Sequence, residues 1–507
     1  MNIDRRAFLA LAGGAIAARA QQPAAKLDVL LNEEIGKISP LLYGQFAEHV
    51  GNLIYDGIWV GPSSRIRNRQ GLRLDTLEAL QKIQPGVVRW PGGCFADAYH
   101  WEEAVGPQAS RIHRRNHWWN RDEPNTFGTD EFLAWSRLLG AEPYLSVNVG
   151  SGSVAEALNW VEYCNGAGSH YADLRARNGH AEPYGVKWWG IGNENWGCGG
   201  LFTASEYAQQ FREYSIYFKR FGMSDDKELV AVGHTAEWNQ EFLDKVGGGL
   251  PYLNHLSIHH YFRRGRTTQF SDDEYHALMR DLTPFEEEIR TAISALQKAD
   301  QRRAKIAVFG AMKLRPVGLV IDEWGVWDAE STPQNNFLQN GPLREALFAA
   351  SCLNLFHRYC DRISMTNIAQ AINVLQALII TDGASMILTP TYHVYRMYLL
   401  HQNATCVRTE PREGSISVSA SKAGNRLLLT LVNPSLTEDV DIEVTIRGGK
   451  PSQVEATNLT AASVRTQNTL EQPDAVSPRP WKARIEAPGV ILNIPARSVQ
   501  AVSIGLT

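Results

Sequence analysis

The 507-residue sequence has little cysteine, little net charge and no hydrophobic run long enough to cross a membrane. Six Cys in a chain of this length do not form a disulfide scaffold. A formal net charge of −4 argues against a nucleic-acid-binding protein held by phosphate contacts and against a polybasic membrane-surface protein. With 44% hydrophobic residues, the chain is expected to be globular, with about three domains or one large catalytic domain and a smaller one.

Several catalytic and metal-binding motifs are also missing. The sequence has no P-loop and no dinucleotide-binding fingerprint, and the segment Gly150–Val154 lacks the final Gly of a serine nucleophile elbow. The pair His259-His260 is not part of a metal-binding spacing, and neither are Cys352 and Cys360, which lie eight residues apart. We therefore predict no cofactor, no structural metal ion and no obligatory disulfide.

Residues 1–20 have the pattern of an export signal. Arg5 and Arg6 precede a short apolar stretch rich in Ala and Gly, and Ala18-Arg19-Ala20 provides an A-x-A cleavage site. This pattern predicts a twin-arginine-type signal that delivers folded protein to the periplasm or the exterior. The alternative is a frayed amphipathic N-terminus. Because residues 1–20 carry three Arg and one Asp, their removal would change the formal charge from −4 to −6.

Between residues 41 and 400, short apolar runs alternate with longer amphipathic stretches. Apolar runs of four to eight residues are typical of strands that are buried on both faces of a parallel sheet. The helix-like stretches between them include Thr129–Leu139, Ala204–Phe221, Pro284–Lys298 and Pro342–Tyr359. This alternation predicts an α/β fold, and its length suits a (β/α)8 TIM barrel over residues 41–400.

The pattern of polar and apolar residues changes after Cys406. Segments such as residues 415–419, 426–432 and 440–446 alternate or nearly alternate in polarity, and turn residues separate them. This pattern predicts an antiparallel β-sandwich over residues 401–507. Residues 21–40 contain a further strand-like segment, which we expect to join the sandwich before the barrel begins.

Each apolar run of the predicted barrel is followed by a polar residue. Barrel enzymes carry their chemistry at the C-terminal ends of the strands, so these residues are the candidates for an active site. In chain order the polar strand ends are Glu48-His49, Arg89, Asn148, Asn193-Glu194, His234, His259-His260-Tyr261, Asp322-Glu323 and Asn367 to Gln370.

Two of these carboxylates, Glu194 and Glu323, lie among Gly and Trp residues. Burial among indole rings raises the pKa of a carboxyl group, as a general acid requires, whereas hydrogen-bond donors keep a nucleophile ionised. Paired carboxylates with Trp platforms suit glycosidic bond cleavage. The alternative for each Glu is an ordinary salt bridge at the barrel rim. Thirteen of the 14 Trp precede residue 330, and Trp90, Trp196 and Trp324 flank these sites, so we expect the Trp surplus at the barrel mouth.

Taken together, seven stretches of the chain resemble the α-L-arabinofuranosidases of glycoside hydrolase family 51. The resemblance covers about residue 26 to the C-terminus. The matching stretches, in order, are residues 38–49, 88–95, 123–132, 192–194, 258–261, 322–324 and 367–370.

The resemblance implies a TIM barrel with a β-sandwich and a retaining double displacement. By match of motif, Glu194 is the acid/base after the fourth strand and Glu323 the nucleophile after the seventh. Retention implies that their carboxyl groups lie roughly 5–5.5 Å apart. The positions expected to bind the sugar or orient the carboxylates are Glu48, Arg89, Cys94, Asn193, His259, Tyr261 and Gln370.

Two residues depart from the family pattern. Cys94 replaces an Asn found in many members, so one hydrogen bond to the sugar is expected to differ. Gly325 replaces the Asn that often follows the Glu-Trp pair of the nucleophile motif. The substrates implied are arabinofuranosyl-containing polysaccharides or oligosaccharides, and family members are often hexamers. The alternatives are an endo-β-glucanase or another pentosidase on the same scaffold, or a non-catalytic carbohydrate-binding protein.

Overall fold

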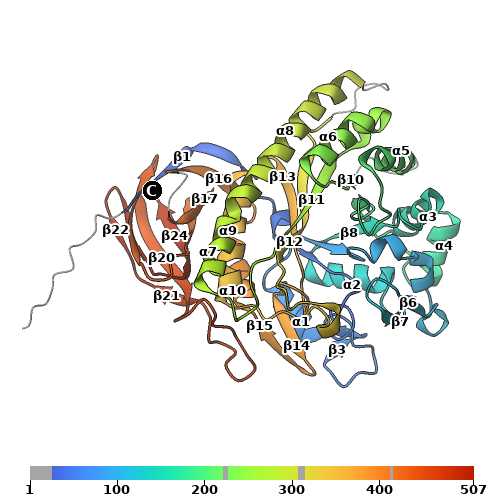
Figure 1. Ribbon diagram of the computed structural model, residues 1–507, viewed down its shortest axis with the longest axis horizontal. Helices are drawn as coiled ribbons and strands as arrows, with labels where there is room; N and C mark the ends of the chain where they lie inside the picture. Colours follow the sequence, from blue (N-terminus) through green and yellow to red (C-terminus); the bar gives the residue numbers. More distant parts are fainter. Residues whose placement is uncertain (1–24, 221–226, 307–313, 412–414) are drawn as a thin grey trace, which may run out of the picture.

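The computed structural model describes residues 25–220, 227–306, 314–411 and 415–507, and it consists of a closed barrel beside a sheet-rich domain (Figure 1). The predicted export signal lies outside the described residues. Among the helices within these ranges, none combines the length and the hydrophobicity that a membrane span requires.

The barrel is closed by eight parallel strands in the order β10-β11-β12-β13-β2-β5-β8-β9. Each of the eight apolar runs predicted from the sequence forms one of them, so the TIM-barrel prediction is confirmed. The strands are β2 (Gly44–Phe46), β5 (Val87–Trp90), β8 (Glu142–Val147), β9 (Trp188–Ile191), β10 (Glu228–Ala231), β11 (His255–Phe262), β12 (Gly318–Val326) and β13 (Ile363–Ile368).

Helices surround the barrel because their apolar faces cover the outward side chains of the strands. Trp90 of β5, for example, stacks on Phe132 of α2 with the ring centroids 4.9 Å apart. The helices are α1 (Leu74–Gln81), α2 (Thr129–Leu139), α3 (Val154–Asn165), α4 (His170–Arg177), α5 (Ala204–Arg220), α6 (Ala236–Lys245), α7 (Asp272–Arg280), α8 (Leu282–Ile306), α9 (Leu343–Arg358) and α10 (Pro390–Tyr398). Three hairpins lie in the loops of the barrel, namely β3–β4 (68–73), β6–β7 (114–123) and β14–β15 (379–388).

The inside of the barrel has an apolar floor and a polar upper layer. The floor is one cluster of buried side chains, namely Val87, Tyr144, Trp188, Val230, Val320 and Met365. Because side chains of a strand alternate in direction, Arg89 points to the same side as Val87 and stands above this floor. The polar residues at the strand ends therefore meet over a packed base, which closes the barrel beneath them.

The sheet-rich domain is a ten-stranded sheet that folds over its own core. Its neighbouring strands are antiparallel except for β1 and β19, which are parallel. Strands near the two ends of the sheet, β20 and β22, contact each other, so the inner faces enclose one apolar cluster as in a sandwich. The strands are β1 (Ala25–Lys37), β16 (Thr405–Glu410), β17 (Ser417–Ala423), β18 (Arg426–Asn433), β19 (Val440–Arg447), β20 (Pro451–Thr460), β21 (Arg479–Trp481), β22 (Ala483–Glu486), β23 (Gly489–Ile494) and β24 (Ser498–Leu506).

The N-terminal strand β1 belongs to this domain and not to the barrel. It lies between β16 and β19, and Figure 1 shows it in blue among strands coloured by late sequence positions. The described chain therefore starts in the sandwich, forms the whole barrel and returns to the sandwich.

The barrel and the sandwich meet along α9, whose residues 343–357 are all buried. One part of the seam between them, around His357 and His401, is joined by neutral hydrogen bonds, while elsewhere Arg465 of the sandwich pairs with Asp272 of α7 at 2.8 Å. His357 of α9 pairs with the hydroxyls of Tyr43 (2.7 Å) and Ser419 (2.8 Å). His401 pairs with the Ser421 hydroxyl at 2.8 Å.

Candidate active site

A cavity of about 350 Å³ opens at the C-terminal ends of the barrel strands. Seven of the nine residues predicted for the site line it, together with aromatic residues from the loops. Its lining includes Glu48, Cys94, Trp119, Glu194, Trp196, His234, His259, Tyr261, Arg263, Glu323, Trp327, Phe337 and Gln370.

A β-bulge in β12 places Glu323 in this cavity. Ser257 of β11 pairs with Val320, whereas His259 pairs with Glu323, so β12 contains one extra residue over this stretch. The bulge turns two successive side chains, Asp322 and Glu323, toward the barrel axis, where alternation would have separated them.

Both oxygens of the Glu323 carboxylate are held by donors from other strands. Arg89 Nη1 of β5 donates to Oε1 at 2.8 Å, and the Tyr261 hydroxyl of β11 donates to Oε2 at 2.7 Å. A charge-assisted bond and a phenol bond to the two oxygens fix the orientation of the carboxylate.

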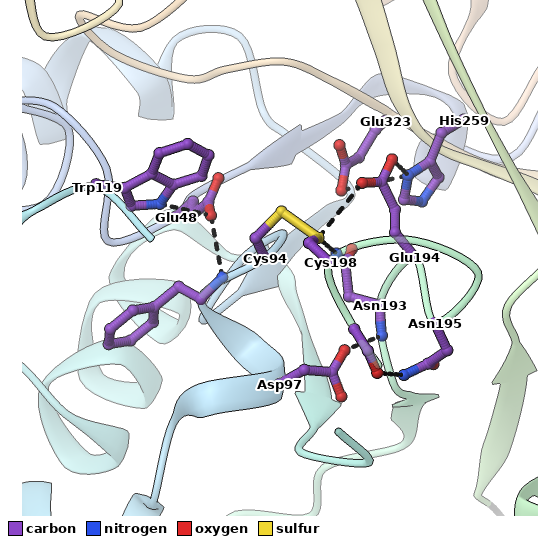
Figure 2. Close-up of a disulfide and its surroundings, with 12 residues drawn as sticks. Glu48, Cys94, Asp97, Trp119, Asn193, Glu194, Asn195, Cys198, His259 and Glu323 are labelled. Atoms are coloured by element: carbon purple, nitrogen blue, oxygen red, sulfur yellow. Dashed lines mark hydrogen bonds and ion pairs between the residues drawn. A yellow bond between two sulfur atoms is a disulfide. The ribbon is translucent and has the colours of Figure 1, made fainter. Parts of the chain in front are cut away.

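Glu194 is presented by a tight loop after β9. Gly192 has φ +89°, and a Cβ at this position would lie 1.9 Å from Asn195 Oδ1, so only Gly fits. Glu194 itself has φ +41°. The loop is anchored by Asp97, whose buried carboxylate accepts the Asn193 amide at 2.8 Å (Figure 2). Glu194 therefore has a fixed backbone in a conformation that non-Gly residues seldom adopt.

His259 lies between three carboxylates at the centre of the site. Its Nδ1 is 2.9 Å from Glu194 Oε1 and 3.5 Å from Glu323 Oε1, and its Nε2 is 3.0 Å from Asp322 Oδ1. One oxygen each of Glu194 and Glu323 and a ring nitrogen of His259 lie within 4.8 Å of one another. The imidazole thus electrostatically connects the two candidate catalytic carboxylates.

The charges of this cluster shift the pKa of each member. Burial alone would lower the pKa of His259, but Glu323 and Asp322 raise it to about 10, so the ring is an imidazolium at neutral pH. Burial alone would raise the pKa of Glu194, but the hydrogen bond and the charge of His259 lower it. Burial raises the pKa of Glu323 against the opposing charges of His259 and Arg89, and repulsion by Glu194 adds to the rise.

These directions are the reverse of those expected for an acid Glu194 and an ionised Glu323. The reason is His259, which we had expected only to bind the sugar or orient the carboxylates. Its positive charge is closer to Glu194 than to Glu323, so it favours the ionised form of Glu194.

Glu48 and Gln370 form the opposite wall of the cavity. The Glu48 carboxylate accepts the Phe95 amide at 3.3 Å, the Trp119 indole N–H at 3.1 Å and the Gln370 amide at 3.3 Å. Burial, together with the charge of Glu323, raises the pKa of Glu48 to about 7. This wall offers both donors and acceptors to sugar hydroxyl groups.

Two predicted residues, Arg89 and Asn193, lie beneath the cavity instead of lining it. Both are buried, and the Arg89 guanidinium bonds to the Asn193 side-chain oxygen as well as to Glu323. Burial alone would lower the pKa of Arg89, but Asp322 and Glu323 raise it above its ordinary value. Arg89 therefore acts as a permanently charged support under the two carboxylates.

The structure gives Cys94 a partner that the sequence did not predict. This residue forms a disulfide with Cys198, 104 positions later in the chain, with the Cα atoms 5.5 Å apart (Figure 2). The prediction of no obligatory disulfide did not foresee this bond, because spacing along a sequence does not identify a partner so far away. The Cys94 sulfur lines the cavity but carries no proton, so it gives no thiol hydrogen bond to a sugar. The remaining four cysteines are free and buried.

The Trp residues expected at the barrel mouth fall into two groups. Trp90 and Trp324 point outward and are buried, with Trp324 packed against Phe356 at 5.1 Å. They follow Arg89 and Glu323 directly, and neighbouring residues of a strand point to opposite faces. The rings that line the cavity come from the loops instead, namely Trp119, Trp196 and Trp327.

Two groups of side chains have the donor atoms of a metal site, but their chemistry does not suit a cation. Cys94 and Cys198 lie beside Glu194, yet their sulfurs are joined and are not thiolates. The second group is Glu194, His259 and Glu323, in which the carboxylates favour a proton on His259 that a cation would have to displace.

Trp119 had no signal in the sequence pattern, and it donates to Glu48 from the long segment between β5 and α2. His234 did have a signal, as the polar residue that follows the strand β10, and it stacks on Trp196 with centroids 3.8 Å apart. Asp322 did have a signal, since it directly precedes Glu323, but its contacts with His259 and Arg89 depend on the bulge in β12.

Comparison with known proteins agrees with this geometry. Residues 79–280 match the family model "Alpha-L-arabinofuranosidase 1 domain", and residues 322–498 match "Alpha-L-arabinofuranosidase C-terminal domain". An intracellular exo-α-L-arabinofuranosidase of Bacteroides ovatus is 36% identical over 491 residues, which cover 91% of this chain and 92% of the relative.

Two solved structures that are similar to this chain are also arabinofuranosidases. The family 51 arabinofuranosidase of Xanthomonas axonopodis pv. citri has a TM-score of 0.88 at 34% identity, covering 94% of this chain and 99% of that one. An α-L-arabinofuranosidase of Thermotoga maritima in complex with arabinose has a TM-score of 0.85 at 30% identity, covering 95% and 100%. The chain belongs to the α-L-arabinofuranosidases of glycoside hydrolase family 51.

Proposed function

We propose that the protein is an exo-acting α-L-arabinofuranosidase that works by a retaining double displacement, with Glu323 as nucleophile and Glu194 as acid/base. The observation that supports this best is the short distance between oxygens of the two carboxylates, within 4.8 Å. Retaining enzymes have carboxyl groups about 5–5.5 Å apart, whereas inverting enzymes leave about 6.5–9.5 Å for a water molecule.

In the first step, a Glu323 oxygen bonds to the anomeric carbon while the bond from that carbon to the leaving oxygen breaks. Glu194 gives its proton to the leaving oxygen. Arg89 and Tyr261 hold the Glu323 carboxylate in one orientation, which is the preorganisation that a covalent attack requires. In the second step, Glu194 takes a proton from water, the water oxygen bonds to the anomeric carbon, and the Glu323 carboxylate is released.

The coupling between the carboxylates supports this exchange of roles. Glu194 and Glu323 repel each other when both are ionised. Once Glu323 is esterified by the sugar, its charge disappears and the pKa of Glu194 falls. Glu194 is then a base in the second step, with the His259 imidazolium stabilising its ionised form.

The size of the cavity favours exo action. A volume of about 350 Å³ suits a terminal sugar held between the Glu48 wall and the carboxylates. The family relatives named above are arabinofuranosidases, which favours a terminal α-L-arabinofuranosyl group as that sugar. The substrates would be arabinose side chains of polysaccharides or their oligosaccharides.

A substrate panel with product analysis tests the proposal. Activity on 4-nitrophenyl α-L-arabinofuranoside is expected to exceed that on the β-D-xylopyranoside and on carboxymethylcellulose. The first product seen by proton NMR is expected to be the α anomer. Negligible arabinoside turnover would contradict the substrate, and a β anomer appearing first would contradict the retaining mechanism.

Export and assembly are proposals of the same kind. The twin-arginine pattern of residues 1–20 supports delivery to the periplasm or exterior, although the Bacteroides ovatus relative is named an intracellular enzyme. Protein recovered from the periplasm or medium of the source organism is expected to lack residues 1–20. An intact N-terminus on protein found only in the cytoplasm would contradict export. Light scattering of the same protein tests the hexamer expected from the family resemblance.

A further inference from the structure

The Cys94–Cys198 disulfide joins two walls of the active site that come from distant parts of the chain. Cys94 lies in the loop after β5, and Cys198 lies in the loop after β9 that also carries Glu194. Figure 2 shows the bond between Glu48 on one side and Glu194 on the other. Neither sulfur takes part in the double displacement itself.

On the Cys198 side, the disulfide touches the acid/base carboxylate. The Cys198 sulfur lies 3.6 Å from Glu194 Oε2, while the other oxygen, Oε1, is bonded to His259 at 2.9 Å. A disulfide sulfur has no proton, so it gives Oε2 no hydrogen bond. Oε2 is therefore the oxygen left free to carry the proton that is transferred to the leaving group.

A reduced Cys198 would change this contact. A thiol at the same place would donate its S–H to Oε2 and compete with the leaving group for that oxygen. A hydrogen bond to the ionised carboxylate also favours ionisation and weakens Glu194 as an acid. Whether Cys198 is oxidised or reduced therefore directly affects how well Glu194 acts as an acid.

On the Cys94 side, the disulfide is tied to the wall that holds Glu48. A Cβ on Gly92 would lie 2.3 Å from Glu48 Cγ, and the Phe95 amide donates to Glu48 Oε1 at 3.3 Å. Residues before and after Cys94 in the chain therefore lie directly against Glu48. Through the disulfide, the position of this wall is linked to that of Glu194.

The loop that carries Glu194 does not depend on the disulfide for its fold. Asp97 accepts the Asn193 amide at 2.8 Å, and the Asn195 side-chain amide donates to the Gly199 carbonyl at 2.6 Å. The Gly197 amide donates to the Glu194 carbonyl at 2.6 Å and closes the turn without any help from sulfur. Breaking the disulfide is therefore expected to change the surroundings of the Glu194 carboxylate and to leave the backbone of the loop in place.

We propose that the Cys94–Cys198 disulfide is a positioning element for acid catalysis. Because the sulfur that it keeps beside Glu194 Oε2 has no proton, this oxygen stays free to protonate the leaving group. This inference rests on the proposed function, in which Glu194 is the acid. The disulfide would therefore act in the step in which the glycosidic bond breaks.

The test compares the oxidised enzyme with the enzyme reduced by a water-soluble phosphine. The phosphine supplies two electrons and takes an oxygen atom from water to become its oxide, and the two protons of that water complete the two thiols. Cys94 lines the sugar cavity and Cys198 lines a neighbouring cavity of about 600 Å³, so a small reductant can reach the bond. Alkylation of the denatured enzyme counts the thiols before and after, and circular dichroism checks the fold.

The decisive readout is the leaving group. Reduction is expected to lower kcat/KM about 10-fold on methyl α-L-arabinofuranoside, whose leaving group needs the proton, and less than about 2-fold on the 2,4-dinitrophenyl arabinofuranoside. On the methyl glycoside, the basic limb of the pH profile is expected to move to lower pH, since a thiol donor lowers the pKa of Glu194. Reoxidation with a disulfide reagent is expected to restore both.

The double variant Cys94→Ala/Cys198→Ala is the matched control and is expected to be insensitive to the phosphine. Equal losses on the two glycosides, no loss at all, or six free thiols in the isolated enzyme would each overturn the inference while leaving the proposed function intact. An oxidised enzyme that cleaves neither glycoside would overturn the proposed function and this inference with it.

Discussion

Two buried histidines, one at the barrel mouth and one at the seam with the sandwich, have opposite charge states. His259 lies among carboxylates, which raise its pKa to about 10 against the effect of burial. His401 pairs with the hydroxyl of Ser421, and burial lowers its pKa to about 3. Both rings are shielded from water, so the partner decides the charge of each one.

The same contrast holds for the groups that surround each histidine. The mouth concentrates charge, with Arg89 and His259 set against Asp322, Glu323 and Glu194. The part of the seam around His357 and His401 uses neutral hydrogen bonds among hydroxyl, amide and imidazole groups. The charged groups that take part in the reaction lie at the mouth, whereas the hydrogen bonds around His357 and His401 join neutral groups.

Replacing Glu323 by Gln tests the charged region most severely. The amide keeps the shape of the side chain but cannot attack the anomeric carbon, so kcat/KM on 4-nitrophenyl α-L-arabinofuranoside is expected to fall at least about 10⁴-fold. Binding of arabinose, followed by calorimetry, is expected to persist, because the Glu48 wall is unchanged.

The matched control is Glu237→Gln, a change in the first turn of α6 outside the cavity lining, which is expected to leave activity unaltered. A Glu323→Gln enzyme that retained substantial turnover would show that another group is the nucleophile. Arabinose binding without turnover in the unaltered enzyme would instead indicate a carbohydrate-binding protein.

Replacing His259 by Gln tests whether its positive charge controls the carboxylates. Loss of the imidazolium is expected to raise the pKa of Glu194 and of Glu323, because a nearby cation favours both ionised forms. Both limbs of the pH profile of kcat/KM should therefore move to higher pH, with a loss of about 10- to 100-fold at the original optimum.

The neighbouring residue supplies the control for this change. His260 pairs with Glu288 at 2.6 Å, outside the cavity, so His260→Gln is expected to leave the pH profile in place. If both variants gave the pH profile of the unaltered enzyme, the claim that the positive charge of His259 controls the two carboxylates would be wrong.

Much of this mouth could be predicted from the sequence. Each barrel strand is an apolar run that ends in a polar residue, and strand ends of a barrel converge, so Glu48, Glu194, Glu323 and Gln370 could be placed in one site before any coordinates. The barrel and the sandwich were predictable for a similar reason, because the period of the apolar pattern changes after Cys406.

Other features depend on three-dimensional detail that the pattern does not contain. The contacts of His259 with three carboxylates require the extra residue of β12, and a single bulge leaves no periodic signal. The pairing of Cys94 with Cys198 requires two loops to meet across 104 residues. Trp90 follows Arg89 in the chain but points to the opposite face of β5, so adjacency in the sequence does not place its ring in the site.

Replacing His401 by Asn tests the neutral region. In the folded protein His401 is uncharged down to about pH 3, whereas in the unfolded chain it gains a proton below about pH 6.5. The unfolded state therefore binds more protons between these values, and the free energy of unfolding falls as pH is lowered through this window.

Without this imidazole, the slope of the unfolding free energy against pH is expected to flatten by up to about 1.4 kcal/mol per pH unit. Urea unfolding at several pH values between about 4 and 6 measures the slope. Activity at neutral pH provides the control and is expected to stay close to that of the unaltered enzyme. An unchanged slope would mean that His401 is not neutral in the folded protein.

Trapping the sugar on Glu323 would establish the covalent step by itself. In a Glu194→Ala variant given 2,4-dinitrophenyl α-L-arabinofuranoside, the first step needs little acid, while the second step lacks its base, so the covalent intermediate should accumulate. Mass spectrometry of the quenched protein is expected to show one added pentosyl group, located on the peptide that contains Glu323. A sugar attached to any other residue, or release of the inverted anomer with no attached sugar, would contradict the retaining mechanism with Glu323 as its nucleophile.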